Sequence, residues 1–404
     1  MSIENNIALL VEIIKDYRID ELDKPLDAEH VQRWLKQFDT GVQDVVLSET
    51  LHIFKSYYFN KNKICEILDS MVSFLQKKYD FKTVQDLIRN VSFVASQTDG
   101  QSQKVLIEML ETEIFDKYNE NINKTIHNKF KHYVYIDDGL YTGSRAKTDL
   151  ERLISEVNSN STLDVFYIVA GQNGLNHVKD ILTKLSKESN VTIEFYKWKL
   201  LQNDKRVSYD SGCEEYFLHQ VCLWPEKKLN SNEIIKNYQK KYEEISPKYE
   251  KRPYRIDPWH NDAGIFTSVK NRNIVEKEFL IQGIKIVEKI SNNKGMYPLG
   301  YNLWPSFGFG SFCAFDMNIS NTCPLVLWWG NPESDCEKLN LWYPLLPRRT
   351  KADASQMANY ELFANEYEKI YHMAQYNMCP DCGEYFGIEK DGGNGFCVQC
   401  SWKH

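Results

Sequence analysis

The stretch that decides the fold is Tyr133-Val-Tyr-Ile-Asp-Asp-Gly-Leu-Tyr-Thr-Gly-Ser-Arg145. Residues 133–136 are β-branched or aromatic, which predicts a buried strand that ends at Asp137 and Asp138. A small, hydroxyl-rich turn follows, and after it apolar residues recur at the spacing of a helix: Leu150, Leu153, Ile154 and Val157. The predicted order is therefore strand, acidic pair, glycine turn and helix.

The turn and the acidic pair have the chemistry of a site for a phosphorylated ribose. A helix N-terminus presents free backbone N–H groups and the positive end of the helix dipole, so it favours a phosphate. Gly143 lets the backbone approach closely, and Thr142 and Ser144 add hydroxyl donors. The carboxylates of Asp137 and Asp138 can accept hydrogen bonds from ribose hydroxyls, directly or through Mg²⁺. The structural alternative is that these acids simply cap a turn and the next helix.

This stretch resembles the phosphoribosyl-diphosphate (PRPP) signature of type I phosphoribosyltransferases. It matches that signature at Asp137, Asp138, Thr142, Gly143 and Ser144. It departs at Tyr141 and Arg145, where the family more usually has small or hydroxyl residues. The resemblance implies a catalytic acidic pair on the ribose, a phosphate site formed by Thr142, Gly143 and Ser144, and Mg²⁺ with the leaving pyrophosphate. Arg145 is a further candidate for contact with the ligand.

The composition of the chain limits the classes of protein to which it can belong. At 404 residues it is long enough for two or three domains, and a hydrophobic content of 42% allows a sizeable core. A net charge of −7 argues against a basic coat for duplex DNA, although a local basic patch stays possible. We expect no membrane span, because no apolar run is long enough. We also expect no signal peptide, because residues 1–6 lack a basic start followed by an apolar core. The scattered cysteines fit a reducing cytosol, so the expected location is cytoplasmic.

Three domains are expected along the chain. Apolar stripes at helical spacing predict a helical or winged-helix-like module at residues 1–85, in which Asp27 is the N-cap of a helix. Residues 86–350 are expected to form the phosphoribosyltransferase-like domain, and residues 351–404 a helix followed by a zinc ribbon.

A second unit of strand, glycine loop and helix lies before the acidic pair in the sequence. Residues 91–95 are predicted as a strand, and the next helix carries Val105, Leu106, Met109 and Leu110. In the phosphoribosyltransferases a loop at this position holds the pyrophosphate. Here its hydroxyls and backbone N–H groups would come from Ser96, Gly100 and Ser102. Any α/β domain has such loops, so the interpretation depends on the position relative to the acidic pair.

Further strands are predicted at residues 163–170 and 191–196, with a helix between them. Strands that alternate with helices predict an α/β fold, with a parallel sheet covered by helices on both faces. Ligands bind at the carboxyl ends of the strands in such sheets, so both loops are expected at one edge. The polar residues 225–255 are expected to form a solvated helix and a linker, or a lid over the site.

Residues 252–349 form a distinct block. A long helix is predicted around Val275 and Phe279, and strands at residues 311–315 and 325–329. Together with the turn Phe307-Gly-Phe-Gly310 and the segment Trp342-Tyr-Pro-Leu-Leu-Pro-Arg348, they resemble the phosphoribosyltransferase-like domain of bacterial conflict systems, over residues 28–349. The resemblance implies an effector of anti-phage defence, with a defence-system protein or a nucleic acid as a possible partner.

Polar residues of this block are candidate ligand contacts. Asn318 and Asn321 could hydrogen-bond the edge of a nucleobase on which a nearby aromatic ring stacks. Arg272 could bind a phosphate, as could Arg348 and Arg349, because a guanidinium binds phosphate bidentately. Core packing is the alternative for the aromatic rings, and salt bridges are the alternative for the arginines.

The end of the chain carries a metal-binding pattern. Two CxxC pairs place four thiolates within reach of one Zn²⁺ ion: Cys379, Cys382, Cys397 and Cys400. The pattern resembles a zinc ribbon, in which a closed four-thiolate site is structural and leaves no position for catalysis. A disulfide or redox pair is the alternative.

Two functions from different classes fit these observations. In the first, the chain is an enzyme that binds PRPP or a nucleotide and transfers or cleaves at the anomeric carbon of the ribose. In the second, the same pocket is catalytically inactive and senses a nucleotide, while the helical module and the zinc ribbon bind a partner.

Overall fold

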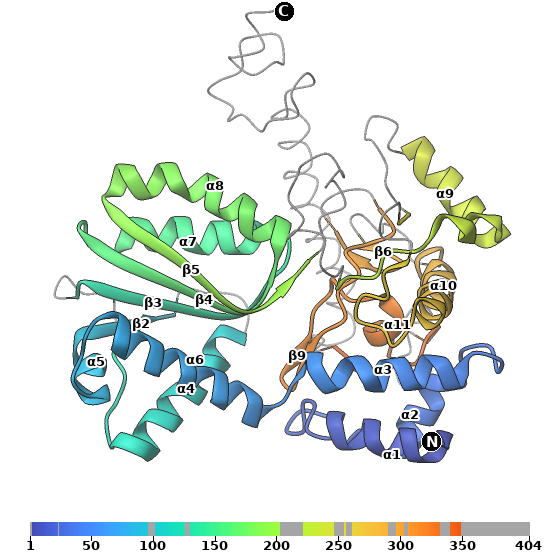
Figure 1. Cartoon of the computed structure of the whole chain (residues 1–404), viewed down its shortest axis with the longest axis horizontal. Helices are drawn as coiled ribbons and strands as arrows, with labels where there is room; N and C mark the ends of the chain where they lie inside the picture. Colours follow the sequence, from blue (N-terminus) through green and yellow to red (C-terminus); the bar gives the residue numbers. More distant parts are fainter. Residues whose placement is uncertain are drawn as a thin grey trace, which may run out of the picture.

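The computed structural model describes residues 2–22, 24–95, 102–124, 126, 130–202, 221–245, 254–255, 261–289, 296–302, 306–331 and 340–348. These residues form two lobes, which lie side by side in Figure 1. The sheet lobe contains β2 to β5 and α4 to α8, and the mixed lobe contains most of the remaining elements. Several candidate residues lie outside the described parts of the chain: Ser96, Gly100, Arg349, Cys379, Cys382, Cys397 and Cys400.

The sheet lobe is built on four parallel strands whose spatial order follows the sequence. They are β2 (Val91–Val94), β3 (His132–Leu140), β4 (Ser161–Gly171) and β5 (Val191–Leu201). Their β-branched and aromatic residues suit strands that are covered on both faces. The predicted parallel sheet is confirmed, and β3 and β5 run further than the sequence predicts.

Helices cover both faces of this sheet (Figure 1). One face carries α7 (Ser144–Glu156) and α8 (Gln172–Ser189), and the other carries α4 (Lys61–Lys78), α5 (Val84–Asn90) and α6 (Ser102–Tyr118). Alternate residues of β3 divide between the two sides. Tyr133 and Tyr135 lie in the core under α7 and α8, whereas Val134 and Ile136 lie in the core with α4 and α6.

The mixed lobe combines helices from both ends of the described chain with short strands. Its helical elements are α1 (Ile3–Ile14), α2 (Ala28–Leu35), α3 (Gln43–Tyr57), η3 (Lys227–Ser231), α9 (Glu233–Ile245), α10 (Val269–Val287) and α11 (Leu325–Trp328). Its strands are two-residue pieces: β1 (Tyr58–Phe59), β6 (Met296–Tyr297), β7 (Gly300–Tyr301), β8 (Ala314–Phe315) and β9 (Asn318–Ile319).

The first 85 residues do not share one core. Leu10 and Trp34, from α1 and α2, lie in one core with Phe279 and Leu327, whereas α4 contributes to the core of the sheet lobe. Trp34 also donates a hydrogen bond from Nε1 to the backbone oxygen of Val326 over 2.9 Å. The expected domain boundary near residue 85 therefore does not coincide with a boundary between cores.

Residues 325–328 form a helix, α11, so the predicted strand at 325–329 is wrong. All four helical residues are buried, and the segment therefore has no alternation of buried and exposed positions. A short, wholly apolar run does not distinguish a buried strand from a buried helix. The strand predicted at 311–315 is also shorter, because only Ala314–Phe315 pairs in β8.

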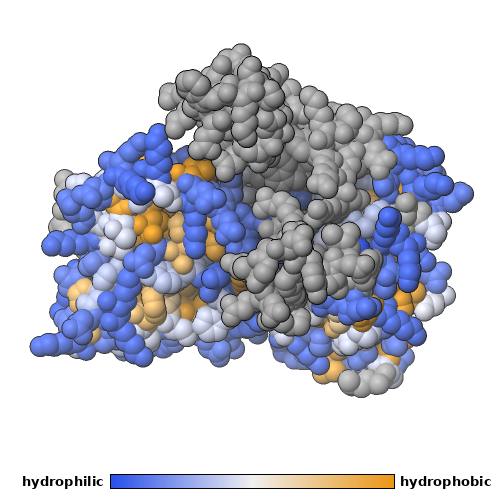
Figure 2. All heavy atoms as spheres, turned by 45° about the horizontal axis from the view of Figure 1, so that its top comes forward, coloured by the Kyte–Doolittle hydropathy of each residue, from blue (hydrophilic) through white to orange (hydrophobic). Residues whose placement is uncertain are grey.

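No described helix combines the length and apolar character that crossing a membrane requires. The face in Figure 2 is mostly hydrophilic where the residues are described, with hydrophobic groups in smaller areas.

Asp316 lies at the junction of the Asp16–Arg18 turn with β1 and β8. Its backbone oxygen accepts a hydrogen bond from Arg18 N over 2.7 Å, and its N–H donates to Phe59 O over 2.9 Å. Asp16 accepts a hydrogen bond from the Tyr58 hydroxyl over 2.8 Å. Burial, and then the charge of Asp16, raises the pKa of Asp316 to about 7.

We expect Asp316→Asn to stabilise the protein at about pH 8 and to have little effect at about pH 4. Because the pKa of Asp316 is higher in the folded state, the protein loses stability as the pH rises from about 4 to about 7. Removing the charge should restore about 2 kcal/mol of unfolding free energy above that window. Urea unfolding across this pH range measures the effect, with Asp20→Asn as an exposed control. An unchanged pH dependence in the Asp316 variant would contradict it.

Candidate functional site

The acidic pair lies within β3 and not after it. The ladder between β2 and β3 ends at Val94 opposite Tyr135, but β3 continues beside β4 to Leu140. Asp137 is therefore still paired with Tyr167 of β4. The predicted end of the strand at the acids is wrong, because β4 supplies backbone partners beyond them. Even so, both acids lie past the carboxyl end of β2, at the edge where the sequence places the site.

Asp137 is held by groups from two elements. Its carboxylate accepts hydrogen bonds from Ser102 Oγ over 3.3 Å, from the Tyr135 hydroxyl over 3.4 Å and from Asp138 N over 3.0 Å. Ser102 is the first residue of α6, and Gln103 next to it donates to Ile136 O over 3.1 Å. The structure thus brings the start of the helix after the first loop against the acidic pair.

The two acids differ in their surroundings. Asp137 is only 6% exposed, whereas Asp138 is half-buried. Burial raises the pKa of Asp138, and hydrogen bonds from the Gly139 backbone and within the pair oppose that rise. The pair therefore presents a fixed carboxylate next to a half-buried one that takes up a proton more readily than an ordinary aspartate.

The glycine turn ends in an open helix N-terminus. Gly143 is the N-cap of α7 at a φ of 88°, a left-handed conformation that favours glycine, and no side chain of the described residues caps the helix there. Thr142 and Ser144 flank it and are half-buried. Arg145 is exposed, with Nε 3.9 Å from Asp149 Oδ2. Free N–H groups, hydroxyls and a cationic side chain can together bind a phosphate.

Tyr141 connects this turn to Phe309 and Cys313, which lie in the core of the sheet lobe although they are far away in the sequence. Its hydroxyl lies 3.4 Å from Cys313 Sγ, and its ring contacts Phe309 edge to face, with 5.8 Å between the ring centroids. Two glycines make room for it: a Cβ at Gly139 would lie 2.5 Å from the Tyr141 ring, and one at Gly174 would lie 2.0 Å from Tyr141 O. Tyr141 therefore packs the turn against both the start of α8 and the segment at residues 309–313, and burial raises its pKa.

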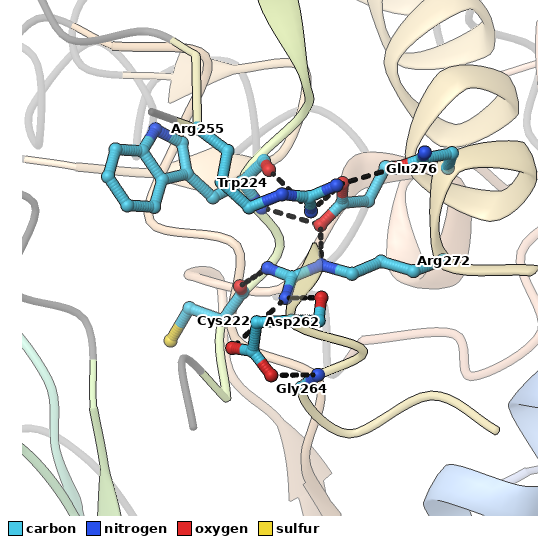
Figure 3. Close-up of polar contacts among 8 residues, drawn as sticks. Cys222, Trp224, Arg255, Asp262, Gly264, Arg272 and Glu276 are labelled. Atoms are coloured by element: carbon cyan, nitrogen blue, oxygen red, sulfur yellow. Dashed lines mark hydrogen bonds and ion pairs between the residues drawn. The ribbon is translucent and has the colours of Figure 1, made fainter. Parts of the chain in front are cut away.

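Arg272 is part of a buried ionic network in the mixed lobe (Figure 3). Its Nε donates to Glu276 Oε1 over 2.9 Å, and Nη1 donates to Asp262 O over 2.9 Å. Arg255 binds the other oxygen of Glu276 over 2.9 Å. Neither arginine has any exposed area, so Arg272 has a structural role in this network. The structure therefore does not support the predicted contact of Arg272 with a phosphate.

Asn318 is the first residue of β9, and Asn321 lies in the turn that follows this strand. Asn318 Oδ1 accepts a hydrogen bond from Ile319 N over 3.0 Å, and Asn321 O accepts one from Tyr301 N over 2.8 Å. Both residues are half-buried. A contact with a nucleobase stays a prediction for the two side chains.

Sequence reasoning missed Tyr135, Tyr167 and Asp149. Tyr135 precedes Asp137 by two residues and so shares its face of β3, which is a signal in the sequence. Tyr167 is opposite Asp137 on β4, and burial followed by the charge of Asp137 raises its pKa. Asp149 lies on the buried side of α7, next to Leu150. A polar residue in an apolar helical stripe was the available signal.

Two cavities of about 390 and 240 Å³ occur elsewhere in the mixed lobe and at its border. The larger one is lined by His52, Ile53, Ser56, Tyr57, Val221, Gly264 and Ile265. The acidic pair and the glycine turn line neither of these two cavities. The assignment of the candidate site therefore depends on the chemistry of its residues.

We expect Gly174→Ala to destabilise the protein by about 1–3 kcal/mol, because the new methyl group would displace the backbone of the turn at Tyr141. Urea unfolding measures the loss. Gly41→Ala is the matched control, since its nearest atom would be the flexible Asp39 side chain at 3.2 Å. Equal stability of the two variants would show that the turn does not pack tightly on α8.

Comparison with known proteins supports the family resemblance that the sequence predicts. No curated protein matches the sequence. A family model, PRTase-CE, matches residues 31–348, which include both lobes, the acidic pair and the glycine turn. The matched region carries a phosphoribosyltransferase-like domain. Because the match covers most of the chain, this protein belongs to the PRTase-CE family.

Proposed function

We propose that the chain is an enzyme that binds PRPP or a nucleotide and transfers or cleaves at the anomeric carbon of the ribose. The observation that carries the proposal is the meeting of Ser102 and Asp137, whose side chains lie 3.3 Å apart. It brings the start of α6, the acidic pair and the open N-terminus of α7 to one edge of the sheet. Membership of the PRTase-CE family supports the same reading.

Each part of the ligand has a partner of suitable chemistry. The ribose hydroxyls would donate to Asp138, while Asp137 is fixed beneath by Ser102 and Tyr135. The 5′-phosphate would accept from the turn that leads into α7, with Thr142 and Ser144 adding hydroxyls and Arg145 adding charge. The pyrophosphate would lie toward α6, on the side of the predicted Ser96 and Gly100 loop. These groups would fix the ribose so that its anomeric carbon points away from the sheet edge.

The acidic pair suits Mg²⁺ as well as ribose hydroxyls. Within the described ranges, no group of three or more His, Cys, Asp or Glu side chains is placed to hold a metal ion. Two carboxylates fit Mg²⁺, which usually combines one or two of them with water and ligand phosphates. When bound, Mg²⁺ would neutralise negative charge on the departing pyrophosphate. A structural Zn²⁺ at the four C-terminal cysteines stays a prediction.

The chemistry needs charge stabilisation and orientation. The bond from the anomeric carbon to its leaving group breaks, the electron pair leaves with that group, and an acceptor or water supplies a new pair. The sugar is then positively charged, and the carboxylates of Asp137 and Asp138 oppose that charge. Ser102 and Tyr135 keep Asp137 in place during this step, because they bind its two different oxygens.

We propose anti-phage defence in the cytoplasm as the biological setting, on the resemblance of residues 28–349 to conflict-system domains. Depletion or modification of a nucleotide pool during infection would be the effect. A defence protein or a nucleic acid would be the partner.

The second candidate function is a nucleotide sensor without turnover. The observation that favours it is Tyr141, whose ring and hydroxyl contact Phe309 and Cys313. The binding of a ligand at the turn would then act directly on Phe309 and Cys313. Tight AMP binding without consumption of PRPP would favour this function over the first.

We expect the double variant Asp137→Asn with Asp138→Asn to lose about 100-fold or more of its turnover, because both opposing charges are gone. Mass spectrometry of nucleotide pools incubated with the protein and Mg²⁺ measures turnover, and titration calorimetry with PRPP and AMP measures binding. Glu151→Gln with Glu156→Gln on α7 is the charge-matched control, because it also removes two carboxylates. Full turnover in the correctly folded double variant would exclude a catalytic role for the pair.

A further inference from the structure

The larger of the two cavities lies where the lobes meet. Its volume of about 390 Å³ falls in the range of small-molecule pockets, whereas the cavity of about 240 Å³ is smaller than that range. Two of its lining residues, Tyr57 and Ile265, pack against the core of the mixed lobe and also against the core of the sheet lobe. We call it the junction cavity. A ligand bound there would contact groups from both lobes.

The junction cavity lies at the carboxyl end of β5. That strand ends at Leu201, and the next residue, Gln202, accepts a hydrogen bond over 3.2 Å from the N–H of the lining residue Val221. Ligands of parallel sheets bind at this edge. The cavity therefore belongs to the same edge of the sheet as the acidic pair, but it is a separate place, at a different strand.

The buried ionic network holds two walls of the junction cavity in place (Figure 3). Arg272 donates from Nη1 to Asp262 O over 2.9 Å and from Nη2 to Cys222 O over 3.5 Å. Asp262 in turn accepts a hydrogen bond over 2.8 Å from the N–H of Gly264, a lining residue. Cys222 directly follows the lining residue Val221. These walls are fixed before a ligand arrives, so binding loses less affinity to the ordering of the protein.

The lining of the junction cavity combines apolar walls with unused polar groups. Among the residues that the structure describes, none hydrogen-bonds to the side chains of His52, Ser56 or Tyr57. Tyr57 is half-buried, and its ring adds a flat apolar surface to walls that are otherwise mostly branched aliphatic. Such a lining suits a flat, apolar ring system that carries polar groups at its edge.

Two lysines adjoin this lining. Lys199 Nζ lies 5.2 Å from the centroid of the Tyr57 ring, and Lys63 Nζ donates to Ser56 O over 3.0 Å. Within the described ranges Lys199 forms no ion pair and no hydrogen bond, and a carbonyl does not neutralise the charge of Lys63. Burial and then the charge of Lys199 lower the pKa of Lys63, and Glu66 opposes this only in part. The two cations therefore repel each other, and both would attract an anionic group.

We infer that the junction cavity is a second ligand site, for a small molecule that joins a flat, apolar ring system to an anionic group. The ring system would lie against Tyr57 and the aliphatic walls, and the anion would accept a hydrogen bond from Lys199. A nucleoside monophosphate has this chemistry and serves as the probe. Binding there does not depend on the proposed phosphoribosyl chemistry, since no residue of the cavity belongs to that site.

Photolabelling of the full-length protein with an azido-substituted AMP tests the inference. Tyr57 and the glycine turn lie in different tryptic peptides, residues 56–61 and 132–145, so mass spectrometry reports the two sites separately. The probe concentration that gives half-maximal labelling of each peptide measures the affinity of each site. We expect saturable labelling of the peptide that contains Tyr57 or of the one that contains Ile265. A label that appears only at the glycine turn, or at neither place, overturns the inference.

Variants test the role of the cation. Lys199→Ala should weaken labelling at the junction cavity by about tenfold, from the loss of a charge-assisted hydrogen bond. It should leave labelling of the glycine turn unchanged. Lys197→Ala is the matched control, because it removes an exposed lysine of the same strand that contacts no described residue of the cavity. Melting temperatures check that both variants fold, and equal labelling of the two would contradict the proposed contact.

Competitors test the two halves of the ligand. AMP should displace the probe from the junction cavity at least about tenfold better than adenosine, which lacks the phosphate. Inorganic phosphate, which lacks the ring system, should displace it poorly. If adenosine competes as well as AMP, the anionic group is not recognised, and if inorganic phosphate does, the apolar walls contribute nothing. Either result overturns the inference.

Discussion

The difference in length between β2 and β3 determines where the candidate site lies. β2 stops at Val94, while β4 continues to supply backbone partners for β3 as far as Leu140. The backbone beyond β2 is therefore fixed on one side and open on the other. Ser102 occupies that open side at the beginning of α6, where it reaches Asp137. A shorter β3 would leave the acids in a turn, with no rigid relation to either helix.

The mixed lobe is stabilised by a different kind of interaction. Glu276 is fully buried and binds Arg255 through one oxygen and Arg272 through the other. Removing charges from water costs several kcal/mol for each ion, and backbone carbonyls such as Cys222 O and Trp224 O help to offset that cost. The network joins α10 to the segments at residues 222–224 and 255. Such a network fixes the relative positions of these segments in addition to any stability that it contributes.

Local patterns in the sequence were enough to predict the sheet, the long helices and the N-cap at Asp27, which accepts a hydrogen bond from His30 N over 2.9 Å. They also predicted that the two loops would lie at one edge of the sheet, but not that Ser102 would bond to Asp137. The partners of Tyr141 were not predictable, because Cys313 lies 172 positions away in the chain. The burial of Arg272 was not predictable either, since an Arg–Glu pair at i, i+4 has the same sequence pattern inside and outside a protein. Tertiary packing decides both.

The shared core of the mixed lobe has a consequence for the order of folding. Trp34 hydrogen-bonds Val326 across 292 residues of sequence, and Tyr17 bonds Pro347 across 330. During synthesis the first three helices therefore emerge long before their distant packing partners, although they also contact one another. The sheet lobe, whose strands are consecutive, can assemble while the ribosome is still translating the rest. The amino-terminal helices must wait with apolar faces uncovered, and that interval is when the chain is most exposed to aggregation or in need of a chaperone.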